Sequence, residues 1–300
     1  MSPLRLGVIG LSPGNGHPYS WSAIFNGYDP VCMEECGFPV IPRYLEKQSF
    51  PQDAIAEAKV THVWVQNNAI AQHVAKATLI PNVVGHYTDM IGEVDGILLA
   101  RDDAENHFEF AAPFIKEGIP IYIDKPLALN AREAKKILDL QCYPGQIFSC
   151  SALRYAKEFQ LSHADRLQVG RLSHIYASVP NDWNKYAVHV IEPLLLLAKE
   201  RGTIEFIQTR QYDGSTTLVV EYSGGLQVTI AAMGLTCAPL SIRLMGDSGW
   251  RDLFFTDTYS AFKGALFDFI QGVICRDVRI NSEFMLEVVN LIEYGRGGDC

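Results

Sequence analysis

The stretch LRLGVIGLSPGNGH, residues 4–17, determines the predicted fold of the first half of the chain. Its first six residues form a short apolar run that ends in glycine, which is typical of a buried parallel strand. Glycines after such a strand let the backbone turn tightly and approach a pyrophosphate, and the next helix supplies unpaired N–H groups. Because Gly10, Gly14 and Gly16 depart from the spacing G-x-G-x-x-G, a phosphate cradle and an ordinary turn both stay open.

Beyond this loop, the first half of the chain alternates strand and helix patterns. The expected strands are residues 60–65, 96–100, 120–123 and 146–151, and the expected helices are 18–26, 69–79, 104–117 and 131–140. This alternation predicts a parallel sheet with helices on its faces. Residues 28–59 contain four prolines and are expected to be an irregular insertion.

The second half has a different pattern, in which several strands follow one another. The expected strands are residues 172–179, 204–212, 216–222, 226–232, 240–245 and 250–255, and the expected helices are 186–199, 258–274 and 282–294. Ser223-Gly224-Gly225 predicts a hairpin turn. We therefore expect two domains: a doubly wound parallel α/β domain over 1–152, and an α+β domain with an open, mainly antiparallel sheet over 153–300.

Composition limits the function classes. Acidic residues exceed basic ones, 34 to 25, and the net charge of −9 disfavours nucleic acid as a partner. No apolar run approaches about 18 residues, so no membrane span is expected. The seven scattered cysteines and the lack of a secretion-signal layout predict a cytoplasmic protein with reduced thiols. Cys32 and Cys36 lack further ligands at suitable spacing, so no metal site is expected.

Asp124-Lys125-Pro126 follows the predicted strand 120–123. The carboxyl ends of parallel strands open onto the ligand crevice of such sheets, so a lysine there is placed to act on a ligand. Pro126 restricts the local backbone. A role of Lys125 in proton transfer and a plain surface lysine that caps the strand are equally compatible with this position.

A second polar feature lies in the predicted helix of the second half. Lys185, His189 and Glu192 are spaced i, i+4, i+7, so they share one helical face. A polar stripe with a histidine near a helix start suits acid/base chemistry, although a structural histidine stays an even alternative.

The strand 60–65 ends in Gln66-Asn67-Asn68, where a dinucleotide domain usually has an acid for the adenosine ribose. These amides can hydrogen-bond a ribose and would not repel a 2′-phosphate, while no arginine follows to bind one. The choice between NAD and NADP therefore stays open. His17 could contact a cofactor or substrate, or hold the loop structurally.

Together these segments resemble the Gfo/Idh/MocA family of glucose–fructose oxidoreductases and inositol dehydrogenases, over nearly the whole chain. The family's E-K-P segment is similar to Asp124-Lys125-Pro126, and its D-x-x-x-H-x-x-D segment to Lys185-x-x-x-His189-x-x-Glu192. The segment 151–155 resembles the one after the sixth Rossmann strand, with its Arg-Tyr pair. The strand 94–100 resembles the one before the family's Thr-Pro/His loop, with His107 near the expected histidine.

The resemblance implies an NAD- or NADP-dependent oxidoreductase with a Rossmann-type cofactor domain and a second domain for substrate and for assembly into a homodimer or homotetramer. The reaction would transfer hydride to or from a secondary alcohol or ketone of a sugar, nucleotide-sugar or polyol. Catalytic roles would fall to Lys125, His189 and Lys185. Cofactor contacts would come from Gly10, Gly14, Asn15, Gly16, His17, Gln66, Asn67, Arg101, Asp124 and Lys125, and substrate contacts from Arg154, Tyr155, Trp183 and Glu192.

The sequence departs from the family pattern at four places. The glycine loop is altered, and the insertion 28–59 precedes the second strand. Arg101-Asp102-Asp103 replaces the usual Thr-Pro, and Lys185 replaces a frequent aspartate. These departures motivate two alternatives: a non-catalytic NAD(P)-binding regulator or scaffold on the same fold, and a chain that no longer binds a dinucleotide.

Overall fold

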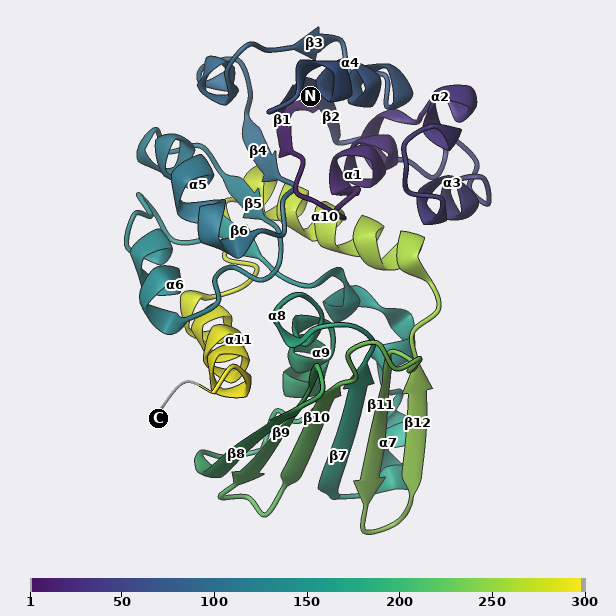
Figure 1. Cartoon of the computed structure of the whole chain (residues 1–300), viewed down its shortest axis with the longest axis vertical. Helices are drawn as coiled ribbons and strands as arrows, with labels where there is room; N and C mark the ends of the chain where they lie inside the picture. The colour runs from purple at the N-terminus through teal and green to yellow at the C-terminus, as the bar shows by residue number, and fades with distance from the viewer. Residues whose placement is uncertain (1, 298–300) are drawn as a thin grey trace. The chain divides into compact units, whose positions relative to one another are not determined.

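The computed structural model describes residues 2–297 and divides the chain into two compact units (Figure 1). The first unit contains Met1–Ala128, Arg132–Cys150 and Phe262–Met285. The second contains Leu129–Ala131, Ser151–Ala261 and Leu286–Cys300. The sequence prediction assigned everything after residue 152 to the second domain, whereas Phe262–Met285 clusters with the first unit.

The first unit is built on a six-stranded parallel sheet in the order β3-β2-β1-β4-β5-β6. Its strands are β1 Leu4–Gly10, β2 Ala58–Val65, β3 Asn82–Val83, β4 Gly96–Leu99, β5 Ile121–Ile123 and β6 Ile147–Ser149. The strand order reverses between β1 and β4, and ligands of open parallel sheets bind at the carboxyl ends of the strands beside such a reversal. The doubly wound parallel fold is confirmed; β3, which has only two residues, was not predicted.

Helices cover the sheet of the first unit. They are α1 His17–Asn26, α4 Asn68–Ala77, α5 His107–Lys116, α6 Ala131–Leu138 and α10 Thr258–Cys275, with short 3₁₀ turns at Tyr87–Met90 and Ala104–Asn106. Phe269 of α10 packs on Tyr122 and Phe148, with ring centroids 5.8 and 5.7 Å away. Trp21 of α1 stacks on Tyr122 at 4.7 Å. This aromatic layer explains why a late segment of the chain belongs to the first unit.

The insertion 28–59, predicted to be irregular, contains two short helices, α2 Pro30–Glu34 and α3 Val40–Leu45. Asp29 caps α2 by accepting a hydrogen bond from Cys32 N at 2.9 Å. The insertion reaches the beginning of α1: a Cβ atom added to Gly16 would lie 2.7 Å from both Phe38 and Ile41.

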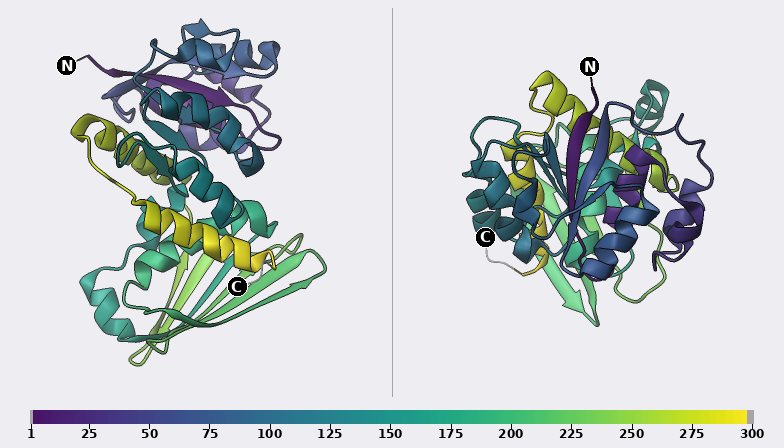
Figure 2. Two further views of the ribbon diagram at one scale, coloured as in Figure 1. Left: turned by 90° about the vertical axis from the view of Figure 1, so that its left-hand side faces the viewer. Right: turned by 90° about the horizontal axis from the view of Figure 1, so that it is seen from above.

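The second unit contains a mixed, mainly antiparallel sheet in the order β12-β11-β7-β10-β9-β8; Figure 1 labels its strands, and Figure 2 shows the sheet from another side. Its strands are β7 Leu172–Val179, β8 Ile204–Tyr212, β9 Ser215–Tyr222, β10 Gln227–Ala232, β11 Ser241–Gly246 and β12 Trp250–Phe254. β7 and β10 pair in parallel, and the other pairs are antiparallel. The predicted hairpin at residues 223–225 is confirmed, since Tyr222 N donates to Leu226 O at 2.9 Å.

One face of this sheet is covered and the other is open. Ile175, Val228 and Leu244 are buried on the covered face. The open face carries large apolar side chains with exposed fractions of 40–63%, namely Tyr176, Phe206, Trp250 and Phe254.

The helices of the second unit are α7 His163–Val169, α8 Trp183–Tyr186, α9 Val188–Leu197 and most of α11 Ser282–Gly295, with 3₁₀ turns at Ala152–Tyr155 and Lys157–Phe159. The single helix predicted over 186–199 is wrong in its bounds, because α8 and α9 meet at Ala187. Within residues 2–297, the structure contains no helix with the length and apolar character needed to span a membrane.

A substitution at Gly10 tests the close packing between the end of β1 and the start of α1. A Cβ atom there would lie 2.2 Å from Pro18 Cγ. We expect Gly10→Ala to lower the free energy of unfolding by about 1–3 kcal/mol in urea titrations, because α1 must move. The control is Gly85→Ala, whose Cβ would lie 3.7 Å from Asp89 Oδ2 and should change stability by less than about 1 kcal/mol. Equal stabilities of the two variants would contradict this packing.

Candidate active site

In the first unit, a buried carboxylate ties the glycine loop to the end of β5. Asp124 is 1% exposed. Its Oδ2 accepts a hydrogen bond from Asn15 Nδ2 at 2.8 Å and lies 2.5 Å from His17 Nδ1. Its Oδ1 accepts a hydrogen bond from Lys125 N at 2.8 Å. Both oxygens are therefore used to fix the shape of the loop and the start of the Lys125 segment.

Asp124 is ionised at neutral pH. Burial by itself raises the pKa of this carboxyl, but the charges of His17 and Lys125 and the hydrogen bonds from His17 and Asn15 outweigh it and lower the pKa to about 2. An ionised acceptor at Nδ1 favours the His17 tautomer that carries its hydrogen there. The ring is further held by Trp21, stacked at 5.0 Å, and by the edge of Phe262 at 5.0 Å.

Lys125 is 7% exposed, so it is not the solvated lysine of the simpler alternative. Its Nζ lies 3.7 Å from Asp102 Oδ2, and Asp102 Oδ1 accepts a hydrogen bond from Ser12 Oγ at 2.6 Å. Asp102 is one of the residues that replace the family's Thr-Pro pair. The replacement thus supplies a counter-ion to the lysine, and Ser12 links this pair to the glycine loop.

Arg101 lies beside the end of β2, although the sequence indicated no arginine there. Its guanidinium pairs with Asp103 at 3.0 and 2.5 Å and donates to Gln66 Oε1 at 3.1 Å. It also lies over the Phe110 ring, 4.6 Å from the centroid. No arginine follows β2 in the sequence, but Arg101 reaches Gln66 because the sheet order places the end of β4 near that of β2, across β1.

The backbone N–H groups in the first turn of α1 are already hydrogen-bonded within the chain. His17 N donates to Asn15 Oδ1 at 2.7 Å, Tyr19 N and Ser20 N donate to Gly16 O at 3.0 and 3.1 Å, and Pro18 has no N–H. The expectation of unpaired N–H groups at this helix start is wrong for these positions. By contrast, Gly14 is exposed at φ +81° with open space around it.

These residues fit a dinucleotide that approaches the exposed backbone at Gly14 rather than the first turn of α1. Gln66 and Asn67 lie at the β2 end of this edge and Lys125 at the β5 end. Gln66 exchanges hydrogen bonds with Leu11 N and O at 3.0 and 2.5 Å, and Asn67 Oδ1 caps α4. Both amides are thus partly committed to the protein itself.

In the second unit, Ser151 connects the two polar residues of α9. Its N–H donates to Glu192 Oε1 at 2.9 Å, and its Oγ lies 2.8 Å from His189 Nδ1. The same hydroxyl accepts a hydrogen bond from Leu153 N at 3.2 Å. His189 and Glu192 therefore turn toward the same residue, and the ring of His189 is fixed by its Nδ1 contact.

Glu192 is 3% exposed, and burial raises its pKa to about 8, although Arg154 and the Ser151 N–H favour the ionised form. Among the residues that the structure describes, no partner hydrogen-bonds its Oε2. A buried, protonated carboxyl that accepts from Ser151 N holds that serine in place.

The other predicted substrate contacts are spread over the second unit. Trp183 is buried, and its indole N–H donates to Ile292 O at 2.8 Å, so its polar atom is used in packing. Arg154 and Tyr155 are half-buried in the 3₁₀ turn Ala152–Tyr155. Lys185 is half-buried in α8, where its N–H donates to Asp182 Oδ1 at 3.1 Å.

Sequence reasoning missed the site's connecting residues Ser12, Asp102 and Ser151. Ser12 and Ser151 each follow a strand, and Ser151 also opens the segment 151–155 that resembles the family's sequence. His107 was noted by its position: it is fully buried, and its ring nitrogens lie 2.8 Å from Arg101 O and 3.0 Å from Leu127 O. It links the segments after β4 and β5. Within residues 2–297, no group of three or more His, Cys, Asp or Glu is arranged to hold a metal ion.

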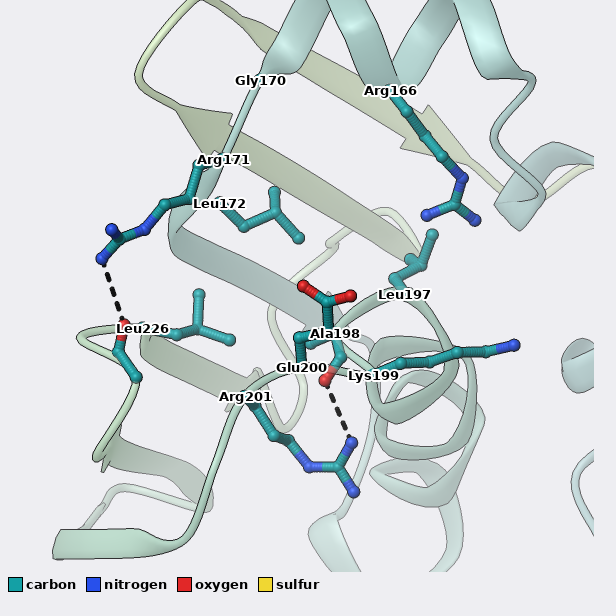
Figure 3. A pocket seen from close by; sticks show the side chains of 11 residues that line it. Arg166, Gly170, Arg171, Leu172, Leu197, Ala198, Lys199, Glu200, Arg201 and Leu226 are labelled. Atoms are coloured by element: carbon teal, nitrogen blue, oxygen red, sulfur yellow. Dashed lines mark hydrogen bonds between the residues drawn. The ribbon is translucent and has the colours of Figure 1, made fainter.

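A cavity of about 400 Å³ in the second unit is a weaker candidate (Figure 3). Four basic residues line it, but Figure 3 shows Arg171 and Lys199 pointing to opposite sides. Arg171 donates to Gly224 O at 3.3 Å, and Arg201 to Ala198 O at 3.0 Å. Because these cations diverge and bind backbone carbonyls, the cavity does not form a converging anion site.

The pH dependence of the unfolding free energy tests the buried contact between Glu192 and Ser151 in the second unit. The folded pKa of Glu192, about 8, lies above the ordinary 4.5, so the folded state holds this proton more tightly, and its stabilisation is lost as pH rises through that interval. Between pH 5 and 8.5, we expect the wild type to lose roughly 4 kcal/mol of unfolding free energy relative to Glu192→Gln. Urea titrations measure this difference. The exposed Glu200→Gln should follow the wild type; a Glu192→Gln profile parallel to the wild type would contradict the assignment.

Comparison with known proteins supports the fold and its cofactor class. Residues 40–150 match the Gfo/Idh/MocA profile, described as an oxidoreductase family with an NAD-binding Rossmann fold. The matched segment begins after the glycine loop. No curated protein matched the sequence.

Several solved structures share the whole two-domain fold. Myo-inositol 2-dehydrogenase from Lactobacillus plantarum superposes with a TM-score of 0.77 at 13% identity, over 99% of this chain and 97% of that one. UDP-N-acetylglucosamine 3-dehydrogenase from Acidithiobacillus ferrooxidans gives 0.73 at 13%, over 99% and 98%. Biliverdin reductase from Synechocystis sp. PCC 6803, in complex with biliverdin and NADP+, gives 0.70 at 12%, over 99% of both chains. Residues 40–150 are thus similar to the Gfo/Idh/MocA oxidoreductase family, and the chain shares the two-domain fold of these solved structures.

Proposed function

We propose that the chain transfers hydride between NAD(P) and a secondary alcohol, or its ketone, of a sugar, nucleotide-sugar or polyol. The observation that carries the proposal is Lys125, a buried lysine at the carboxyl end of β5, 3.7 Å from the Asp102 carboxylate. A cation held at the ligand edge of a Rossmann sheet is placed to hydrogen-bond a substrate oxygen on which charge develops.

The chain's own residues would handle the proton. When the alcohol is oxidised, His189 takes the hydroxyl proton while Lys125 hydrogen-bonds the oxygen or shares the proton transfer; in reduction, His189 returns the proton. The bound cofactor accepts or supplies the hydride. The Ser151 contact at Nδ1 orients His189 for this role. Lys185 would position the substrate by binding an anionic group of the substrate.

The substrate class rests on the family resemblance. Two structural neighbours are named as dehydrogenases of an inositol and of a nucleotide-sugar, which supports a polyhydroxylated substrate. The neighbour with bound biliverdin shows that the same fold also serves other substrates, so the substrate must be found by screening.

Substitution of Lys125 and His189 tests these roles. We expect Lys125→Met and His189→Ala to lower kcat by about 100- to 10,000-fold, because each removes a group that acts at the reacting oxygen. Turnover is followed by nicotinamide absorbance on a panel of sugars, nucleotide-sugars and polyols. Lys116→Met, an exposed position on α5, is the control. Full turnover in both site variants would refute the assignment.

A second candidate function is a non-catalytic NAD(P)-binding regulator or scaffold. The observation that favours it is the first turn of α1, whose donors are already bound within the chain. Cofactor binding without hydride transfer across the whole panel would support this role. No change in melting temperature with either cofactor would instead indicate that dinucleotide binding has been lost.

We further propose that the chain assembles as a homodimer or homotetramer through the open sheet face of the second unit. Tyr176, Phe206, Trp250 and Phe254 expose large apolar surface on this face. Large apolar side chains exposed along an open sheet face are buried when a second copy of the chain packs against it. The apolar core residues of β10, Val228 and Ile230, lie on the covered face instead and do not contribute.

Charge introduced on this face tests the assembly. Phe206→Glu and Trp250→Glu should each shift the mass measured by light scattering toward a single chain, because a charge would be buried in the interface. Leu167→Glu changes an exposed apolar residue on α7 and should leave the mass unchanged. A mass unaffected by both sheet variants would exclude this face.

A further inference from the structure

The first unit contains a cavity of about 340 Å³ whose wall is built in part by the insertion. Leu11 of the glycine loop, Asn67 after β2, Tyr19 of α1 and His73 of α4 line it, and Glu35 and Phe38 of the insertion line it as well.

The position and walls of this cavity suit a nucleoside. It lies at the carboxyl ends of β1 and β2, the place where a Rossmann sheet receives the adenosine half of a dinucleotide. Its volume falls within the range of about 300–1,000 Å³ that is usual for small-molecule sites. Leu11, Tyr19 and Phe38 supply apolar and aromatic surface, and the two rings are tilted with centroids 6.2 Å apart. Such walls favour a flat purine base.

The usual ribose acid is absent from the end of β2, and the amide in its place is occupied. Gln66 binds both the N–H and the carbonyl of Leu11, and Asn67 Oδ1 accepts from Ala69 N at 2.9 Å. The insertion brings a carboxylate to the same place from another part of the chain. Glu35 is exposed and lines the cavity directly after α2.

We propose that this cavity is the adenosine subsite and that Glu35 accepts hydrogen bonds from the ribose hydroxyls, so that the insertion selects NAD over NADP. The inference rests on the proposed use of a dinucleotide. A carboxylate holds a 2′,3′-diol through charge-assisted hydrogen bonds and repels a 2′-phosphate.

The charges of the side chains around the cavity are consistent with a preference for NAD over NADP. Burial raises the pKa of Tyr19 to about 12 and also raises the pKa of the Cys36 thiol, so both stay neutral and Glu35 is the anionic group. Among the described residues that line the cavity, none is lysine or arginine. Arg101, the nearby cation at Gln66, is buried and paired with Asp103, which offsets its attraction for a phosphate.

Calorimetric titration with NAD+ and NADP+ tests the proposal without any turnover. The wild type should bind NAD+ at least about 10-fold more tightly than NADP+. Glu35→Gln should weaken NAD+ binding by about 10-fold and bring the two dissociation constants close together, a loss typical of one hydrogen-bonded charge. Glu34→Gln removes a neighbouring exposed acid that does not line the cavity, and it should match the wild type.

The outcomes separate this inference from the catalytic proposal. Equal NAD+/NADP+ selectivity in the wild type and in Glu35→Gln, with binding intact, would overturn the role of Glu35 and leave hydride transfer standing. Absence of binding by NAD+, NADP+ and AMP to the wild type would overturn the subsite itself. The expected selectivity without turnover on any substrate would support the subsite and refute the dehydrogenase.

Discussion

The buried Asp124 carboxylate is the constraint on which the first unit's site depends. An ionised carboxylate away from water is tolerated only when charges and hydrogen bonds compensate it. Asn15, His17 and the Lys125 backbone provide this compensation, at 2.5–2.8 Å. The same contacts hold the glycine loop against the end of β5 and fix the start of the Lys125 segment. The need to compensate one buried charge therefore determines the conformation of the loop and of the segment after β5.

This arrangement changes which groups at the carboxyl edge of the parallel sheet are accessible to a ligand. The polar groups of the loop form hydrogen bonds within the chain, and side chains of the insertion pack against Gly16. What stays accessible is the exposed backbone at Gly14 and the cavity that the insertion helps to enclose. In the second unit, Ser151 plays a part similar to that of Asp124, because it holds His189 and Glu192 from one position.

Sequence patterns predicted those parts of the structure that follow local periodicity. The β1–glycine–α1 start, the alternating first half and the hairpin at 223–225 all arise from short-range rules, and the structure confirms them. The Lys125–Asp102 pair and the reach of Arg101 toward Gln66 could not be read in advance, because they depend on which strands become neighbours. The prolines of the insertion predict an irregular segment and hide the two short helices α2 and α3.

A crystal structure with bound NAD+ tests the central claim most directly, namely that the dinucleotide lies along the carboxyl edge of the first unit's sheet. We predict the adenosine in the cavity beside Glu35, the pyrophosphate near the exposed Gly14 backbone and the nicotinamide next to Lys125. A dinucleotide bound elsewhere, or one seated on the first turn of α1 after displacement of Asn15 from Asp124, would contradict this account.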